Sequence, residues 1–212
     1  MSKKPFEMDM VDKRLSDLYT SEDNKLEKYD RWAVDYEADL VEEMNYVAHI
    51  DAARIFSDII TDKSCQVLDV ACGTGLVAGE LDRLGYEAID GTDFSTEMLR
   101  VSSQRKVYQR LFQHDFTRSL AVPGIYDALI CVGLFSFSLP KITDMIHVIR
   151  AVKPNHYCVI TVNGAAWREL DLGKEIEKES SQHGFVIENI IEAGYIQSQE
   201  IDARVLVIRS PD

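Results

Sequence analysis

The chain is poor in residues that could build a disulfide framework or a metal cluster. Its 212 residues include four cysteines, and these form neither a C-x-x-C pair nor any metal-ligand spacing (Cys65, Cys72, Cys131, Cys158). Three of them stand inside apolar runs, where a reduced cysteine acts as a small hydrophobic side chain. We therefore expect reduced thiols and no metal site.

Long hydrophobic runs are also missing. The longest nearly apolar stretch, residues 128–137, is about half of what a membrane-spanning helix needs. The first residues, Met-Ser-Lys-Lys-Pro-Phe-Glu-Met-Asp, hold no apolar stretch that resembles a signal peptide. The sequence therefore predicts a cytoplasmic, soluble protein without a membrane partner.

Positive charge is scarce. The chain has 23 Lys and Arg against 36 Asp and Glu, a net charge of −13. Affinity for nucleic acid comes mainly from basic side chains that displace counterions, so this balance argues against a broad nucleic-acid-binding face. With 46% hydrophobic residues the chain can bury a core, which excludes disorder along its whole length.

From about residue 64, short apolar runs alternate with amphipathic stretches. We expect strands at 65–70, 85–91, 107–112, 126–132 and 157–162, and helices at 76–84, after the N-cap Ser95, at 142–152 and at 169–182. This alternation predicts an α/β fold with a doubly wound, mostly parallel sheet. Two final strands, 185–192 and 203–209, are separated by too few residues for a crossover helix and should be antiparallel.

The first 60 residues have a different pattern. Apolar residues recur at helical spacing over residues 25–47 and again over 48–60, and the whole stretch 11–60 is interpreted as helical. We therefore predict two units: a helical N-terminal cap or lid at 1–60 and a Rossmann-like core at 61–212.

A glycine turn follows the first predicted strand of the core. Gly73 and Gly75 expose bare backbone at a helix N-terminus, which favours a bound carboxylate or phosphate. The pattern Gly73-x-Gly75-x-x-Ala78 also fits the glycine motif of dinucleotide-binding proteins. A nicotinamide-dependent oxidoreductase therefore remains an alternative. However, the carboxylate of Asp69 would repel a pyrophosphate and suits a cationic ligand without phosphate, such as S-adenosylmethionine.

At this turn the sequence resembles a known family. Residues 67–77, V-L-D-V-A-C-G-T-G-L-V, are similar to the first motif of class I S-adenosylmethionine-dependent methyltransferases. Further motifs of that family follow in order: Asp93-Phe94, His114-Asp115-Phe116, Tyr126-Asp127-Ala128 and Lys153-Pro154-Asn155, where Asn155 replaces the usual glycine. Residues 29–40 resemble the N-terminal segment of the Williams-Beuren syndrome region methyltransferase-like proteins, a likeness that covers about residues 26–165.

The resemblance implies a fold and a cofactor, but no substrate. It implies a seven-stranded sheet of order 3-2-1-4-5-7-6, with strand 7 antiparallel, and a helical N-terminal cap. The same fold serves small molecules, proteins and nucleic acids, so the acceptor does not follow from it.

The motifs and the implied fold together suggest a role for each of the cofactor residues. The backbone at Gly73 and Gly75 would approach the methionine part of the cofactor, and Asp69 would anchor its amino group. Asp93 is expected to accept the ribose hydroxyls, with Phe94 against the adenine. Asp115 would accept from the adenine amino group. The remaining residues expected around the cofactor are Ala71, Met98, Phe116 and Val132.

Aromatic residues of the cap repeat at helical spacing. Tyr29, Trp32 and Tyr36 are expected to form a lid over the sulfonium cation, which aromatic faces attract, although simple packing is an equal alternative. Residues at the ends of the fourth and fifth strands are expected to form the substrate pocket (Gly133, Phe135, Phe137, Asn163, Trp167). No residue stands out as a catalytic base, and His114 is expected near the adenine instead.

The sequence therefore predicts a methyltransferase acting by in-line displacement on a small molecule or a protein side chain. A general base is required only where the acceptor arrives protonated. The alternative is a catalytically inactive S-adenosylmethionine-binding protein that acts through a partner. The sequence leaves the oligomeric state open.

Overall fold

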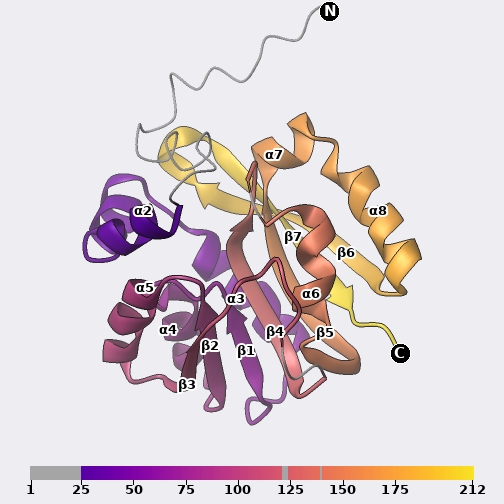
Figure 1. Cartoon of the computed structure of the whole chain (residues 1–212), viewed down its shortest axis with the longest axis horizontal. Coiled ribbons are helices and arrows are strands. Elements are labelled where there is room, and N and C mark those ends of the chain that lie inside the picture. Colours follow the sequence, from indigo (N-terminus) through magenta and orange to yellow (C-terminus); the bar gives the residue numbers. More distant parts are fainter. Residues whose placement is uncertain (1–24, 121–123, 139) are drawn as a thin grey trace, which may run out of the picture.

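A seven-stranded sheet runs through the molecule in the computed structural model, which describes residues 25–120, 124–138 and 140–212 (Figure 1). Its strands are β1 Val67–Val70, β2 Ile89–Asp93, β3 Tyr108–Gln113, β4 Tyr126–Phe135, β5 Val152–Asn163, β6 Val186–Ile196 and β7 Ile201–Arg209. They stand in the order β3-β2-β1-β4-β5-β7-β6. Strand β7 runs antiparallel to both its neighbours, and all other neighbouring strands pair in parallel. The predicted fold class and strand order are confirmed.

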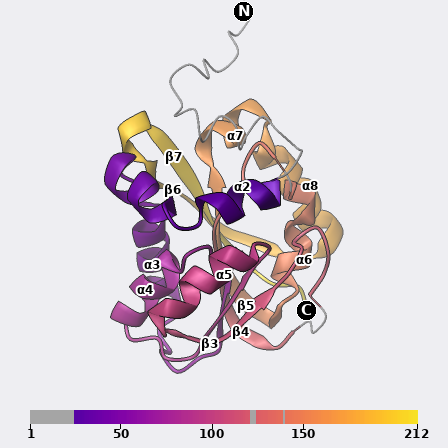
Figure 2. The same ribbon diagram turned by 60° about the vertical axis from the view of Figure 1, so that its left-hand side comes forward.

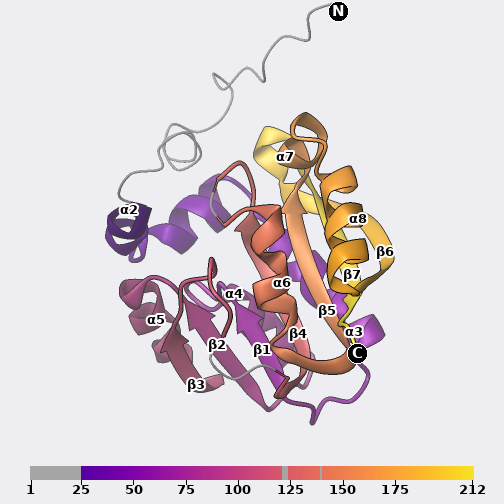
Figure 3. The ribbon, with the colours of Figure 1, turned by 45° about the vertical axis from the view of Figure 1, so that its right-hand side comes forward.

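Helices cover both faces of this sheet and bury its central strands. These helices are α3 Ala48–Ile59, α4 Leu76–Arg83, α5 Thr96–Ser102, α6 Met145–Ile149, α7 Gly164–Glu169 and α8 Leu172–His183. One buried cluster joins Phe56 of α3 and Leu81 of α4 to Ile130 of β4. A second cluster joins Ile149 of α6 and Leu129 of β4 on the other face. Figure 3 shows α6 in front of β4 and α8 in front of β7 and β6. Because both faces are covered, β1 and β4 are almost wholly apolar runs, as the sequence indicated.

The N-terminal segment differs from the long helix predicted over residues 25–47. Helix α2 (Lys25–Trp32) ends in a turn, and the short π-helical segment η2 (Ala38–Glu43) follows it. The turn is closed by the Trp32 indole, whose Nε1 donates to Asp39 at 2.6 Å. Figure 2 shows α2 lying across the molecule above α5. The single helix is therefore wrong, and the part of the prediction that falls on residues 11–24 lies outside the described residues.

Several other boundaries shift. The helix predicted at 169–182 begins at Leu172 as α8, because Asp171 adopts a left-handed backbone (φ 52°) that separates it from α7, which ends at Glu169. The helix predicted at 142–152 ends at Ile149, and β5 begins three residues later. The second strand begins at Ile89 and reaches Asp93, past the predicted end at residue 91. Ser95 caps α5 as predicted, accepting from the Met98 amide at 3.1 Å.

The division into a cap and a core stays a prediction. Helix α3 lies within the predicted cap, yet it contacts α4, β4, β5 and β6 and forms part of the layer over the sheet. Within the described ranges, no helix is long and apolar enough to span a membrane. All four cysteines are free and buried.

Candidate functional site

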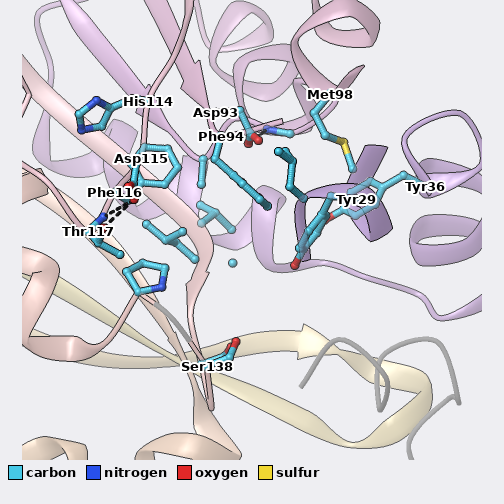
Figure 4. A pocket seen from close by; sticks show the side chains of 18 of the residues that line it. Tyr29, Tyr36, Asp93, Phe94, Met98, His114, Asp115, Phe116, Thr117 and Ser138 are labelled. Atoms are coloured by element: carbon cyan, nitrogen blue, oxygen red, sulfur yellow. Dashed lines mark hydrogen bonds between the residues drawn. The ribbon is translucent and has the colours of Figure 1, made fainter. Parts of the chain in front are cut away.

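A cavity of about 730 Å³ opens at the carboxyl ends of the strands. Its lining comes from residues at and after the carboxyl ends of β1, β2, β3 and β4, and from Tyr29 of α2 and Tyr36, which stand on one side of it in Figure 4. Of the predicted cofactor residues, eleven line it: Tyr29, Trp32, Tyr36, Ala71, Gly73, Asp93, Phe94, Met98, Asp115, Phe116 and Val132. Segments far apart in the sequence therefore meet around one space, where an open α/β sheet binds its ligands.

The two glycines of the turn have different surroundings. A Cβ built on Gly73, whose φ is +53°, would meet no atom within 4 Å, so backbone faces open cavity there. A Cβ on Gly75, whose φ is +90°, would lie 2.8 Å from Cδ of Arg105. Gly73 therefore presents backbone to a ligand, whereas Gly75 starts α4 beneath the Arg105 side chain and does not line the cavity.

Asp93 holds the glycine turn to the end of β2. Its two carboxylate oxygens accept from the backbone amides of Gly73 and Ser95, both at 2.9 Å. Burial raises the pKa of Asp93 to about 6, while these amides and that of Phe94 act in the opposite direction. A carboxylate has about four lone-pair positions, so each oxygen keeps the capacity to accept from a ligand hydroxyl.

Asp69 lies beneath the turn, fully buried in β1 and outside the lining of the cavity. Its Oδ2 accepts from the Tyr108 hydroxyl at 2.7 Å, and its Oδ1 has no hydrogen-bond partner among the described residues. Burial raises the pKa of Asp69 to about 7, the Tyr108 hydrogen bond lowers it, and the charge of Asp93 raises it further. A buried carboxylate with one unpartnered oxygen is a costly arrangement that a nearby cationic group would relieve.

The opposite end of the cavity has a mixed aromatic and polar wall. Phe116 is buried at this end and Met98 is buried on the opposite side, with the partly exposed Phe94 between them (Figure 4). Asp115 accepts from the Thr117 amide at 3.0 Å and from its hydroxyl at 2.7 Å, and these bonds lower the pKa of Asp115. His114 lines the same wall, where its Nε2 lies 2.8 Å from the Arg118 carbonyl oxygen.

The lid segment is docked on the core by polar and aromatic contacts. The Ser95 hydroxyl donates to Asp30 of α2, and Arg105 donates to Glu37 at 2.6 Å. The ring of Tyr29 meets Phe94 edge to face, with ring centroids 5.4 Å apart. Figure 4 shows Tyr29 and Tyr36 on the side of the cavity opposite His114 and Asp115. The aromatic stripe therefore packs over the site.

Among the five predicted substrate-pocket residues, Gly133 lines the cavity and the other four do not. Phe135 is buried in the core under α6 and α7, and Phe137 and Trp167 pack against the same cluster. Asn163 caps α7, where its Oδ1 accepts from the amides of Ala165 and Ala166. Successive side chains of a strand point to opposite faces, so a position at a strand end does not by itself direct a side chain toward the ligand.

Sequence reasoning missed a pair of tyrosines, Tyr46 and Tyr195, that line the cavity beside Gly133. Their rings meet edge to face with centroids 5.4 Å apart. The strand predicted to end at residue 192 continues to Ile196 in β6, which brings Tyr195 to the edge of the sheet beside the cavity. If the strand predicted at 185–192 had been extended to residue 196, the sequence would have indicated Tyr195. No local sequence pattern, however, predicts that Tyr46 contacts Tyr195.

The residues present fit S-adenosylmethionine. Asp69 has a buried oxygen under the turn without a partner among the described residues, a side chain on Gly73 would occupy open cavity, and Asp93 offers a carboxylate at the wall. The donor set combines acidic groups with aromatic faces, as a ligand carrying an ammonium, a sulfonium and an adenosine requires. The fold and the cavity thus define a Rossmann-like domain with a site that such a ligand fits.

Comparison with known proteins agrees with this class. Residues 67–155 match the family described as "Methyltransferase domain". Methyltransferase-like protein 27 of Homo sapiens is 38% identical over 120 residues, which cover 53% of this chain and 47% of that protein. A ubiquinone biosynthesis O-methyltransferase of Rickettsia typhi is 25% identical over 158 residues, covering 70% of this chain and 63% of that one. The chain thus spans about half to two thirds of the length of these curated relatives.

Solved structures show the same fold. A TehB-like SAM-dependent methyltransferase from Corynebacterium glutamicum superposes with a TM-score of 0.58 at 19% identity, covering 76% of this chain and 87% of that one. The [4+2]-cyclase SpnF also gives a TM-score of 0.58, at 15% identity over 75% of this chain and 80% of that one. Residues 67–155 thus match a methyltransferase family, which implies S-adenosylmethionine as the cofactor, and the solved structures show that the chain shares the fold of such proteins.

Proposed function

We propose that the protein transfers the methyl group of S-adenosylmethionine to a small molecule or a protein side chain. The observation that carries this proposal is that Gly73 and Asp93 meet at one wall of the cavity, while the buried Asp69 lies behind the turn with one oxygen that has no hydrogen-bond partner among the described residues. When bound, the cofactor supplies a methyl carbon that an acceptor lone pair attacks, while the carbon–sulfur electron pair stays on sulfur.

The residues of the glycine turn would hold the methionine and ribose parts of the cofactor. The buried Asp69 lies behind the turn, where its negative charge favours an ammonium group on the cavity side of Gly73. The backbone of Gly73 leaves room for that group, since no atom lies within 4 Å of its missing side chain. Asp93, already oriented by two backbone amides, would accept the ribose hydroxyls.

The remaining predicted residues would enclose the adenine and the sulfonium. Phe94 and Asp115, which line the cavity, would lie against the adenine, and Val132 and Gly133, near the carboxyl end of β4, would leave space for the methyl group. The cofactor residues that complete this enclosure are Ala71, Met98, Phe116 and the lid aromatics Tyr29, Trp32 and Tyr36. The work of these groups is to align the acceptor with the methyl carbon and to exclude water.

The test is to find the methylated product. The protein is incubated with S-adenosylmethionine labelled in its methyl group and, separately, with the small-molecule and the protein fractions of a cell extract. We expect one labelled product by mass spectrometry, absent when Asp93→Ala replaces the wild type. No labelled product from either fraction, with cofactor binding intact, would contradict the proposal.

A second candidate is a cofactor-binding protein that does not transfer methyl groups and acts through a partner. The observation that favours it is the fold itself, because SpnF shares this fold and is a [4+2]-cyclase. This candidate predicts normal binding of S-adenosylhomocysteine and no labelled product.

A further inference from the structure

The cavity continues beyond the cofactor residues into a second part, which we call the acceptor side. It starts at Gly133 and is lined by the loop after β4, the end of β6 and the residues between η2 and α3. Its described lining residues are Tyr46, Leu134, Ser136, Ser138, Pro140, Tyr195 and Ile196. The acceptor side has hydroxyl groups and apolar surface, and none of these described residues carries a charge.

Two tyrosine hydroxyls meet at the point where the two parts of the cavity join. A Cβ built on Gly133 would lie 3.4 Å from the Tyr46 hydroxyl oxygen and 3.6 Å from that of Tyr195. Gly133 itself has a φ of +83° and follows Val132, one of the residues expected beside the cofactor sulfur. Both hydroxyls therefore stand next to the place where the methyl group would be presented.

The two tyrosines are fixed in place by backbone pairing between distant segments. Tyr46 forms an isolated antiparallel bridge with Ile196, and the amide of Val47 donates to the Tyr195 carbonyl at 3.0 Å. The buried ring of His49 stacks on Tyr46 with centroids 5.4 Å apart and planes 13° apart. Because both tyrosines are buried and held from behind, they form a preorganised wall.

Charge is distributed unevenly along the cavity. The acidic, basic and histidine side chains among its described lining residues are Asp93, His114, Asp115 and Arg118, and all four stand at or after the ends of β2 and β3, at the cofactor end. A charged acceptor on the acceptor side would lose its hydration without gaining a counter-charge, which is unfavourable. Primary amines are cationic and carboxylates anionic at neutral pH, whereas hydroxyl compounds are neutral and can exchange hydrogen bonds with phenols.

We propose that Tyr46 and Tyr195 seat the methyl acceptor, and that this acceptor is an uncharged hydroxyl compound with a flat, apolar body. This inference rests on the proposed function. The apolar body would lie against the aromatic and aliphatic wall, and its hydroxyl would bond with the two phenols. Transfer to such an acceptor forms an oxygen–carbon bond, leaves the electron pair of the broken bond on sulfur and releases the hydroxyl proton to solvent.

The test uses three probes with one ring system and different charge: 2-naphthol, 2-naphthoate and 2-naphthylmethylamine. Each is titrated by calorimetry into the full chain saturated with S-adenosylhomocysteine, after binding of S-adenosylhomocysteine has itself been measured. We expect 2-naphthol to bind about tenfold or more tightly than either charged probe. Tyr46→Phe and Tyr195→Phe should each weaken 2-naphthol about two- to tenfold, the loss of one hydrogen bond, with S-adenosylhomocysteine binding unchanged.

Tyr157→Phe is the matched control, because Tyr157 lies within β5 and does not line the cavity. It should leave all three affinities unchanged. Three outcomes would overturn this inference but leave the proposed function standing. They are equal binding of the three probes, tighter binding of a charged probe, and unchanged 2-naphthol affinity in both tyrosine variants. Absence of S-adenosylhomocysteine binding to the wild type would overturn the proposed function and the inference with it.

Discussion

Replacing Asp69 by asparagine should stabilise the protein without cofactor at high pH. Asp69 is fully buried, and its pKa is raised to about 7, first by burial. The unfolded chain has an ordinary aspartate, with a pKa of about 3.9. Between these two values the folded protein holds a proton that the unfolded chain has lost, so stability falls as pH rises through this window.

The magnitude follows from the size of the shift. A rise of about three pKa units at about 1.4 kcal/mol each corresponds to about 4 kcal/mol of lost stability above pH 7. The introduced amide carries no charge and keeps an acceptor for the Tyr108 hydroxyl, which in the wild type donates to Asp69 at 2.7 Å. Asp69→Asn should therefore exceed the wild type in stability by up to about 4 kcal/mol at about pH 8 and by little at about pH 4.5.

Urea unfolding at these two pH values measures the effect. The control is Asp58→Asn, which removes an exposed carboxylate from α3 and should change stability equally at both pH values. S-adenosylhomocysteine at the higher pH should reverse the order, because its ammonium group compensates the charge of Asp69 and stabilises the wild type more. The stability difference between Asp69→Asn and the wild type could prove to be the same at both pH values. In that case the buried charge would not destabilise the folded protein, and this reasoning would be refuted.

Four further predictions concern the cofactor. Asp93→Ala should lower S-adenosylhomocysteine affinity at least about tenfold in calorimetry, since each charge-assisted hydrogen bond contributes about 1.5–3 kcal/mol, and Asp93→Asn should be milder; equal affinities would refute the assignment. In the wild type this affinity should fall as pH drops below about 6, where Asp93 becomes protonated; a pH-independent affinity would contradict an ionised Asp93. Gly73→Val should abolish binding with a near-normal circular dichroism spectrum, because φ is +53° there and the cavity begins at that residue; normal binding would show that the cofactor does not lie on this turn. Amide exchange over residues 25–45 should slow when cofactor is added, while β4 changes little; equal exchange would leave the lid aromatics as ordinary packing.

Much of the fold was predictable because it depends on local pattern. The apolar run of β4 and the Ser95 cap of α5 are properties of neighbouring residues, and both are found as predicted. The turn at Gly73 with Asp93 opposite it follows from the order of strand ends in a parallel sheet.

The rest depends on contacts between distant segments. The helix expected over residues 25–47 is broken where Trp32 bonds to Asp39 and where Tyr46 pairs with Ile196, a residue of the distant strand β6. Periodicity within one segment carries no information about such a partner. The same holds for two residues predicted for the substrate pocket: Phe135 and Trp167 stand at strand ends, but their side chains pack against the buried cluster of the helical layer.

The most direct test of the account is calorimetry of the wild-type chain with S-adenosylhomocysteine and, in parallel, with NAD. A site built from Asp69, Gly73 and Asp93 predicts one S-adenosylhomocysteine bound per chain and no measurable heat with NAD, whose pyrophosphate the buried carboxylate repels. Binding of NAD without binding of S-adenosylhomocysteine would contradict the central claim.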